Sequence, residues 1–172
     1  MDTETLRIFQ NQIMRQSQFA LMAMDDLKNA LSSNDEDRLW YSVQAFLVAA
    51  GNISKLLWPK SNPERGQIVR QSLAVPDDSV LRDRSLRNYF KNFDERIDSW
   101  AKSSKYRVFT DGNIIVPAKF KWLDPNDYFR NFDPDNIVVS FHERQYKLIS
   151  LYKEIRRIHA KSMIEIYGLF EE

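Results

Sequence analysis

The chain of 172 residues contains no cysteine and only four glycines. Without cysteine it has no disulfide, no thiolate metal site and no cysteine nucleophile. Scarce glycine disfavours loops that bind phosphates or dinucleotides, because such loops need glycine where the backbone approaches the ligand. The sequence also has no HExxH, paired-histidine, Walker-type or nucleophile-elbow pattern. We therefore expect no metal site and no cofactor.

Long apolar runs and a strong charge of one sign are missing as well. No run reaches the 18 residues of a membrane helix, and acidic residues stand near the start, where a signal peptide would be basic. We therefore expect a cytoplasmic protein without membrane contact. The formal net charge of +1 gives no overall preference for nucleic acid. The length fits a single domain, residues 1–172.

Apolar residues recur at helical spacing along most of the chain. The pattern predicts helices over 3–31, 35–57, 79–100 and 142–168, and one short helix at 66–73. Thr3 is the expected cap of the first helix. Its expected apolar stripe is Leu6, Phe9, Ile13, Phe19, Met22 and Leu27. The second helix has a wider expected arc: Trp40, Val43, Phe46, Leu47, Ala50, Ile53 and Leu57.

Residues 104–141 break this pattern. Asp111-Gly112, between β-branched and aromatic runs, predicts a small hairpin over 106–117. The later run "IVVSF" could add another strand. We therefore expect an all-α fold, a four-helix bundle with a small irregular or β-hairpin insertion before the last helix.

The stretch "RNYFKNFDERIDSW", residues 87–100, resembles the R-N-x-x-x-H motif of HEPN domains, helical bundles that include metal-independent ribonucleases. The resemblance implies a homodimer whose motif helices form one composite cleft. It assigns phosphate stabilisation to Arg87 and orientation of the site to Asn88. Asn92 occupies the histidine position. An amide has no pKa in the useful range, so Asn92 cannot transfer a proton as imidazole does.

Two histidines could replace the missing one. His142 is expected at the start of the last helix, and His159 among its apolar residues, where a packed histidine is the simpler interpretation. The motif also has a purely structural explanation, because Asp83 with Arg87 and Lys91 with Glu95 are i, i+4 charge pairs of a solvated helix face.

Two basic segments could contact RNA. Arg144, Lys147, Lys153 and Arg157 lie mostly opposite the apolar stripe of the last helix, where they could bind phosphates or simply keep the protein soluble. "KFKWLDPNDYF", residues 119–129, interleaves basic and aromatic residues. Its two lysines, Lys119 and Lys121, could contact RNA while its aromatic rings stack on unpaired RNA bases. Alternatively, the aromatic residues could clamp the insertion onto the bundle.

The interpretation that these patterns favour is a HEPN-like protein with a degenerate ribonuclease motif. The resemblance implies that it associates with RNA or with a partner protein in a prokaryotic defence or toxin–antitoxin system. Two alternatives stay open. One is an active metal-independent endoribonuclease that uses Arg87, Asn88 and a displaced histidine. The other is a helical adaptor without a nucleic-acid role.

Overall fold

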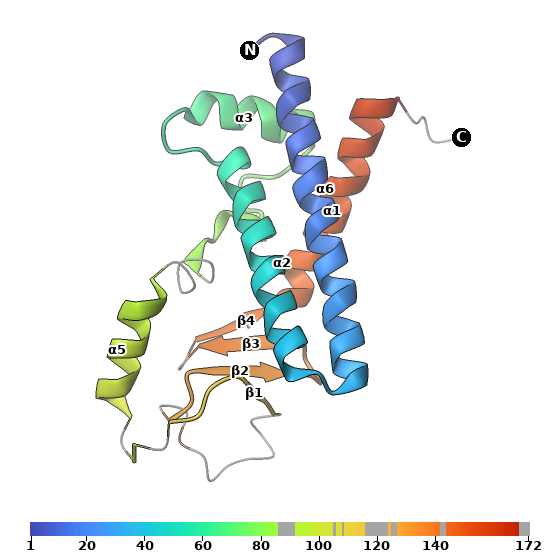
Figure 1. Ribbon diagram of the computed structural model, residues 1–172. Coiled ribbons are helices and arrows are strands. Elements are labelled where there is room, and N and C mark those ends of the chain that lie inside the picture. Colours follow the sequence, from blue (N-terminus) through green and yellow to red (C-terminus); the bar gives the residue numbers. More distant parts are fainter. Residues whose placement is uncertain are drawn as a thin grey trace.

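The computed structural model describes residues 1–85, 92–104, 106–107, 109–115, 124, 127–141 and 144–168. The helices of this part of the chain are α1 (Thr3–Ser33), α2 (Glu36–Leu57), α3 (Pro63–Ser72), the short 3-10 helix η1 (Val80–Arg82), α5 (Phe93–Ser103) and α6 (Leu148–Tyr167). The strands are β1 (Asn113–Ile114), β2 (Arg130–Asp133), β3 (Val138–Phe141) and β4 (Arg144–Lys147). Figure 1 shows α1, α2 and α6 side by side above the sheet, with α5 standing apart.

The first two helices form an antiparallel hairpin. Asp2 caps α1 by accepting a hydrogen bond from the Thr5 backbone N–H, so the expectation that Thr3 is the cap was wrong by one residue. Asn34 ends α1 in the left-handed conformation, and Asp35 caps α2 through the Arg38 N–H. This chain reversal sets α1 and α2 side by side along their length.

The core lies between α1, α2, α6 and the sheet. All seven residues predicted for the arc of α2 are buried, which confirms that part of the pattern. In α1, Ile13 and Leu27 are fully buried, but Phe19 is 49% exposed and Met22 is 56% exposed. The prediction that these two residues belong to the core stripe is therefore wrong. They form a second apolar stripe on the outer side of α1.

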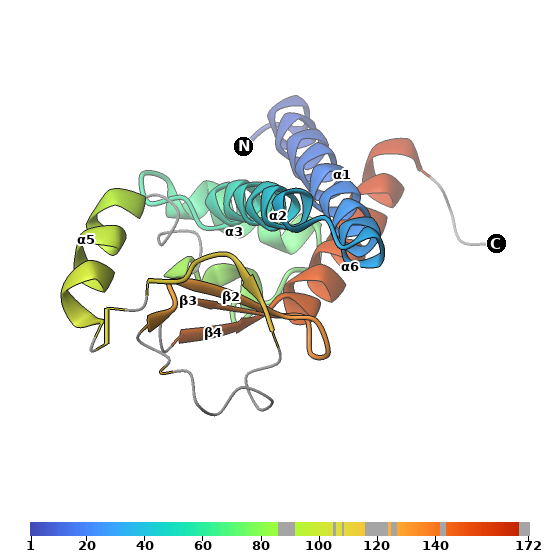
Figure 2. The ribbon, with the colours of Figure 1, turned by 60° about the horizontal axis from the view of Figure 1, so that its bottom comes forward.

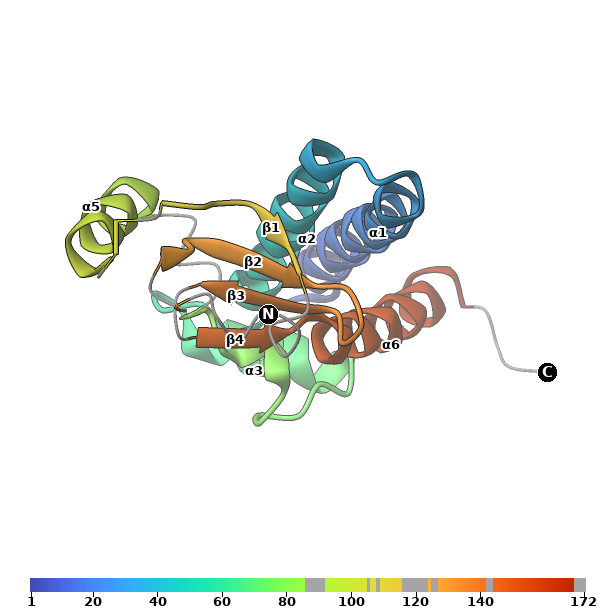
Figure 3. The same cartoon turned by 90° about the horizontal axis from the view of Figure 1, so that it is seen from below.

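A four-stranded sheet of order β1-β2-β3-β4 contradicts the prediction of an all-α four-helix bundle. β2, β3 and β4 pair antiparallel, while β1 runs parallel to β2. Phe132, Val139 and Phe141 are fully buried and belong to the same apolar cluster as the helices. The sheet is thus a layer of the core, and Figures 2 and 3 show it with α6 on one side of the α1–α2 pair.

The expected hairpin around Asp111-Gly112 was wrong. In place of folding back on itself, the chain from Thr110 runs along β2, with a parallel bridge from Thr110 to Tyr128 and then the β1 pairing. Gly112 takes a φ of +68°, a conformation that glycine adopts readily. Here this conformation brings the backbone into contact with a helix and does not form a hairpin turn.

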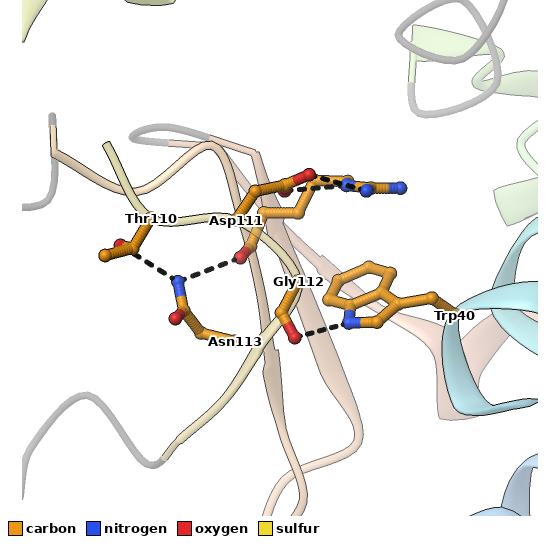
Figure 4. Close-up of polar contacts among 6 residues, drawn as sticks. Trp40, Thr110, Asp111, Gly112 and Asn113 are labelled. Carbon is orange, nitrogen blue, oxygen red and sulfur yellow. Dashed lines mark hydrogen bonds and ion pairs between the residues drawn. The ribbon is translucent and has the colours of Figure 1, made fainter. Parts of the chain in front are cut away.

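That contact joins the sheet to α2. The indole Nε1 of Trp40 donates a hydrogen bond of 2.6 Å to the Gly112 carbonyl oxygen (Figure 4). Arg130 of β2 donates two hydrogen bonds, of 2.8 and 2.6 Å, to the Asp111 carboxylate. The Arg130 guanidinium also lies 5.0 Å from the centre of the Trp40 ring, a cation–π distance. We call Trp40, Asp111, Gly112 and Arg130 the helix–sheet clamp.

Gly112→Ala should lower the free energy of unfolding by about 1–2 kcal/mol. An added Cβ would be strained at this φ and would stand 3.3 Å from the Trp40 Nε1 atom. Gly168→Ala is the matched control, because φ there is +62° but no atom lies within 4 Å of the added Cβ. Urea unfolding should show a larger loss at 112 than at 168. Equal losses would mean that the approach of Trp40 adds no strain.

The last element differs from its prediction at its start. Residues 144–147 were expected in a helix but form β4, where Tyr146 pairs with Val139 of the adjacent strand. α6 then begins at Leu148, whose backbone N–H donates to the Ile137 carbonyl. On this helix Leu148, Ile155 and Ile158 are fully buried, and Leu151 and Tyr152 pack partly buried against the same core.

The connection between α2 and α5 is fixed by two arginines. Arg70 of α3 donates to the Leu57 carbonyl at the end of α2. Arg84 donates to the Ser54 side chain and to the carbonyls of Ser54 and Trp58. Two predictions for this segment had the wrong bounds, because the short helix is Pro63–Ser72 and the helix expected over 79–100 is not continuous. After η1 the backbone is extended at 83.

α5 contacts the rest of the protein through few aromatic rings. Phe93 packs edge-on against Phe129 at 5.5 Å between ring centres, and Trp100 stacks on the same ring at 5.2 Å. None of the α5 residues is buried, and Ile97 is 39% exposed. The helix predicted over 79–100 would be a member of the four-helix bundle, but its described part, Phe93–Ser103, contributes no buried residue to the core.

Candidate functional site

The motif residues are only partly described. Arg87 and Asn88 lie outside the described residues. Asn92 directly precedes α5, with φ −108° and ψ 50°, and its side chain makes no capping hydrogen bond. The prediction placed Asn92 inside a helix that begins near residue 79. The structure corrects this, because α5 begins only at Phe93.

Of the two histidines, only His159 belongs to the described part of the chain. His142 lies outside the described residues. His159 lies on α6 and is partly buried, and burial lowers its pKa below the ordinary value. Figures 1 and 2 show α5 and α6 at opposite ends of the molecule. His159 is therefore not placed to supply the proton transfer that Asn92 cannot perform.

The predicted basic residues divide between a strand and a helix. Arg144 and Lys147 lie on β4, while Lys153 and Arg157 lie on α6; all four are exposed. Lys119 and Lys121 of the second basic segment lie outside the described residues. The basic surface is thus the outer edge of the sheet together with the helix that continues from it, and not one face of a single helix.

Arg157 is held by a local network. It donates hydrogen bonds of 2.9 and 3.0 Å to the two carboxylate oxygens of Glu154, which also accepts one of 2.9 Å from the Ser79 hydroxyl. The hydrogen bonds from Arg157 and then from Ser79 lower the pKa of Glu154, against an opposing effect of burial. Glu154 therefore joins α6 to Ser79 at the start of η1, and it largely matches the charge of Arg157.

Three neighbouring cations are different. Lys147, Lys153 and Arg156 are exposed, and none has an ion pair within the described part of the chain. We call these three residues the β4–α6 cationic surface. Lys153 and Arg156 project from α6 on the side away from the buried Ile155 and Ile158. Arg156 was visible in the sequence as one of the cations of this helix.

A second surface was missed. Phe19 and Met22 of α1 face Tyr41 and Val48 of α2 across a shallow groove on the outer side of the hairpin. The sequence carried a signal for it: Phe19 and Met22 lie well off the helical direction of Ile13 and Leu27 on α1. The irregular stripe of α1 was thus two stripes, one buried and one exposed.

Comparisons with protein-family models, curated proteins and solved structures gave no match for this chain. No helix in the described part of the chain combines the length and hydropathy needed to cross a membrane. Nor do the described residues contain a group of three or more histidine, aspartate or glutamate side chains placed to bind a metal ion.

Proposed function

We propose that this protein is a non-catalytic RNA-associated protein that binds the RNA backbone through the β4–α6 cationic surface. The observation that carries the proposal is the exposure of Lys147, Lys153 and Arg156 on two consecutive elements. Exposed cations of this kind bind phosphates and release counterions, which favours association without sequence readout.

The local charge balance supports a positively charged surface on one side of the protein. Residues 144–168 contain six lysines and arginines and two glutamates, within a chain whose formal net charge is +1. Both glutamates form ion pairs within α6, Glu154 with Arg157 and Glu165 with Lys161. The remaining cations therefore concentrate positive potential on this side of a nearly neutral protein.

The resemblance of "RNYFKNFDERIDSW" to HEPN domains supports RNA as the ligand, and Asn92 supports the absence of catalysis. An amide can hold a phosphate or a water but cannot exchange a proton near neutral pH. The proposal includes a HEPN relationship and a role in prokaryotic defence or in a toxin–antitoxin system. Both rest on this resemblance.

The test is binding of a fluorescent single-stranded RNA 20-mer, measured by anisotropy between 50 and 200 mM salt. For two to three phosphate contacts, log K should fall with log salt with a slope of about −1.5 to −2. The triple variant Lys147→Gln, Lys153→Gln and Arg156→Gln should bind at least about tenfold more weakly and show a flatter slope.

The matched control removes three exposed cations elsewhere: Arg7→Gln, Lys60→Gln and Lys102→Gln. It should change affinity by less than about threefold, because overall charge contributes little beyond a Debye length. Equal losses in both triple variants would contradict a located surface. Cleavage of the RNA by the purified protein, abolished by Arg87→Ala, would contradict the non-catalytic part of the proposal.

A further inference from the structure

The outer side of the α1–α2 hairpin is an exposed apolar face. Phe19, Met22, Tyr41 and Val48 are 49%, 56%, 67% and 50% exposed. Phe19, Tyr41 and Val48 line a groove of about 410 Å³, and Phe19, Met22 and Tyr41 line a smaller hollow next to it. Such side chains seldom gather on a surface that stays in contact with water, so this face has the composition of an interface.

Charges stand at both ends of this face, with opposite signs. Asp37 and Lys55 of α2 are exposed and lie 18 residues apart, which is five full turns, so they project in the same direction. Within the described part of the chain neither has an ion-pair partner. On α1, Arg15 and Asp26 are 11 residues apart, about three turns, and carry the opposite order of charge along that helix.

The two charge pairs share one midpoint. The Asn52–Gln16 hydrogen bond and the Asp26–Arg38 ion pair show which levels of the antiparallel helices lie side by side. By this alignment, the midpoint of Arg15 and Asp26 is level with the midpoint of Asp37 and Lys55. The face is therefore self-complementary: its end at the 34–35 loop carries Asp37 together with Asp26, which is paired with Arg38, and its other end carries Arg15 and Lys55.

We propose that a second copy of this chain covers the face, with the two-fold axis in the interface plane and perpendicular to the helices. This axis sets α2 antiparallel on α2 and α1 antiparallel on α1. Lys55 then meets Asp37 of the second copy, and Phe19 meets Met22, a favourable sulfur–aromatic contact. A two-fold axis parallel to the helices would instead place α2 on α1 of the second copy, with Lys55 near Arg15, so the charges select the antiparallel arrangement.

The area is sufficient for such a dimer. The face from Asp37 to Lys55 is about 27 Å long, and two packed helices are about 20 Å wide. Each copy therefore contributes about 500 Å², and the total of about 1,000 Å² reaches the lower limit of specific interfaces. This dimer leaves the β4–α6 cationic surface free, and it does not use the 79–100 region through which the HEPN resemblance implies a dimer.

Sedimentation equilibrium of the full chain between about 1 and 200 μM tests the proposal, and does not depend on RNA binding. The wild-type protein should dimerise with a micromolar dissociation constant, and Val48→Glu should abolish dimerisation. Asp37→Lys and Lys55→Asp should each weaken it about tenfold, because each turns two attractions into two repulsions. The double variant Asp37→Lys/Lys55→Asp should return to within about threefold of the wild type.

Glu36→Lys is the matched control, since it makes the same charge change in the first turn of α2 but points about 100° away from Asp37. It should leave the dissociation constant unchanged, and circular dichroism should show that every variant stays folded. A monomeric wild-type protein would overturn the proposal. So would a dimer insensitive to Val48→Glu, or single charge variants that the double variant does not rescue.

Discussion

Phe132→Ala should lower the free energy of unfolding by about 3–5 kcal/mol and should destabilise the helices together with the sheet. Phe132 is fully buried on β2 and belongs to the cluster that contains the cores of α1, α2 and α6. Truncating it removes packing from both layers and leaves a cavity. Urea unfolding followed by circular dichroism at 222 nm, which reports mainly helix, should show one transition at lower urea.

Phe109→Ala is the control for this prediction. Phe109, like Phe132, follows α5 in the sequence. It is 46% exposed, however, and packs edge-on against Trp100. Its truncation should cost less than about 1.5 kcal/mol. If Phe132→Ala left the helical transition in place and changed only a separate minor one, the sheet would be an independent insertion on a helical bundle, as the sequence pattern predicts.

Trp40→Ala should cost about 3–5 kcal/mol, because the indole fills the junction between α2 and the sheet. Its ring is 9% exposed, lies under the Arg130 guanidinium and donates to the Gly112 carbonyl. Trp40→Phe keeps a smaller aromatic ring but deletes the donor, so it should cost about 1–2 kcal/mol, near the value of one buried hydrogen bond. Urea unfolding separates the two contributions.

The position control for Trp40 is Gln44→Ala, an exposed site one turn further along α2. It should change stability by less than about 0.5 kcal/mol. A loss in Trp40→Phe as large as in Trp40→Ala would mean that the hydrogen bond to Gly112, and not ring packing, holds the sheet on α2.

The sequence predicted α2 well because one physical requirement dominated it. Its apolar residues, from Trp40 to Leu57, fall on a single wide arc, and every predicted member is buried. The strand β3 was equally predictable from the sequence, since "IVVSF" is a short β-branched run that the structure buries on both sides. Where the apolar spacing of a segment matches the burial of that segment in the fold, the local sequence is sufficient to predict the helix or strand.

Other elements depended on partners distant in sequence. The segment from Arg144 to Lys147 shares the helical spacing of residues 148–168, but pairing with β3 holds it as a strand. Asp111-Gly112 is a favoured turn, yet pairing with β2 and the Trp40 hydrogen bond extend the chain through it. In both places tertiary contacts override local preference, which no single-sequence pattern encodes.

The candidate sites show the same division. The cations of β4 and α6, and the i, i+3 spacing of Glu154 and Arg157, could be read from the sequence, but the hydrogen bond from Ser79 to Glu154 could not, because these two residues are 75 positions apart. Phe19 and Met22 were visible as apolar residues of α1. Their exposure could be seen only once it was known which side of α1 faces α2 and α6.

The packing of α1 against α6 has a consequence for synthesis on the ribosome. These helices share one apolar core although more than 100 residues of chain separate them, so this core closes only after α6 has been made. At about 5–20 residues per second, the α1–α2 hairpin waits on the order of ten seconds for α6. During that time the outer apolar stripe of α1, and the part of its inner stripe that α2 leaves uncovered, are open to other molecules, so the nascent hairpin presents apolar surface that a chaperone can bind.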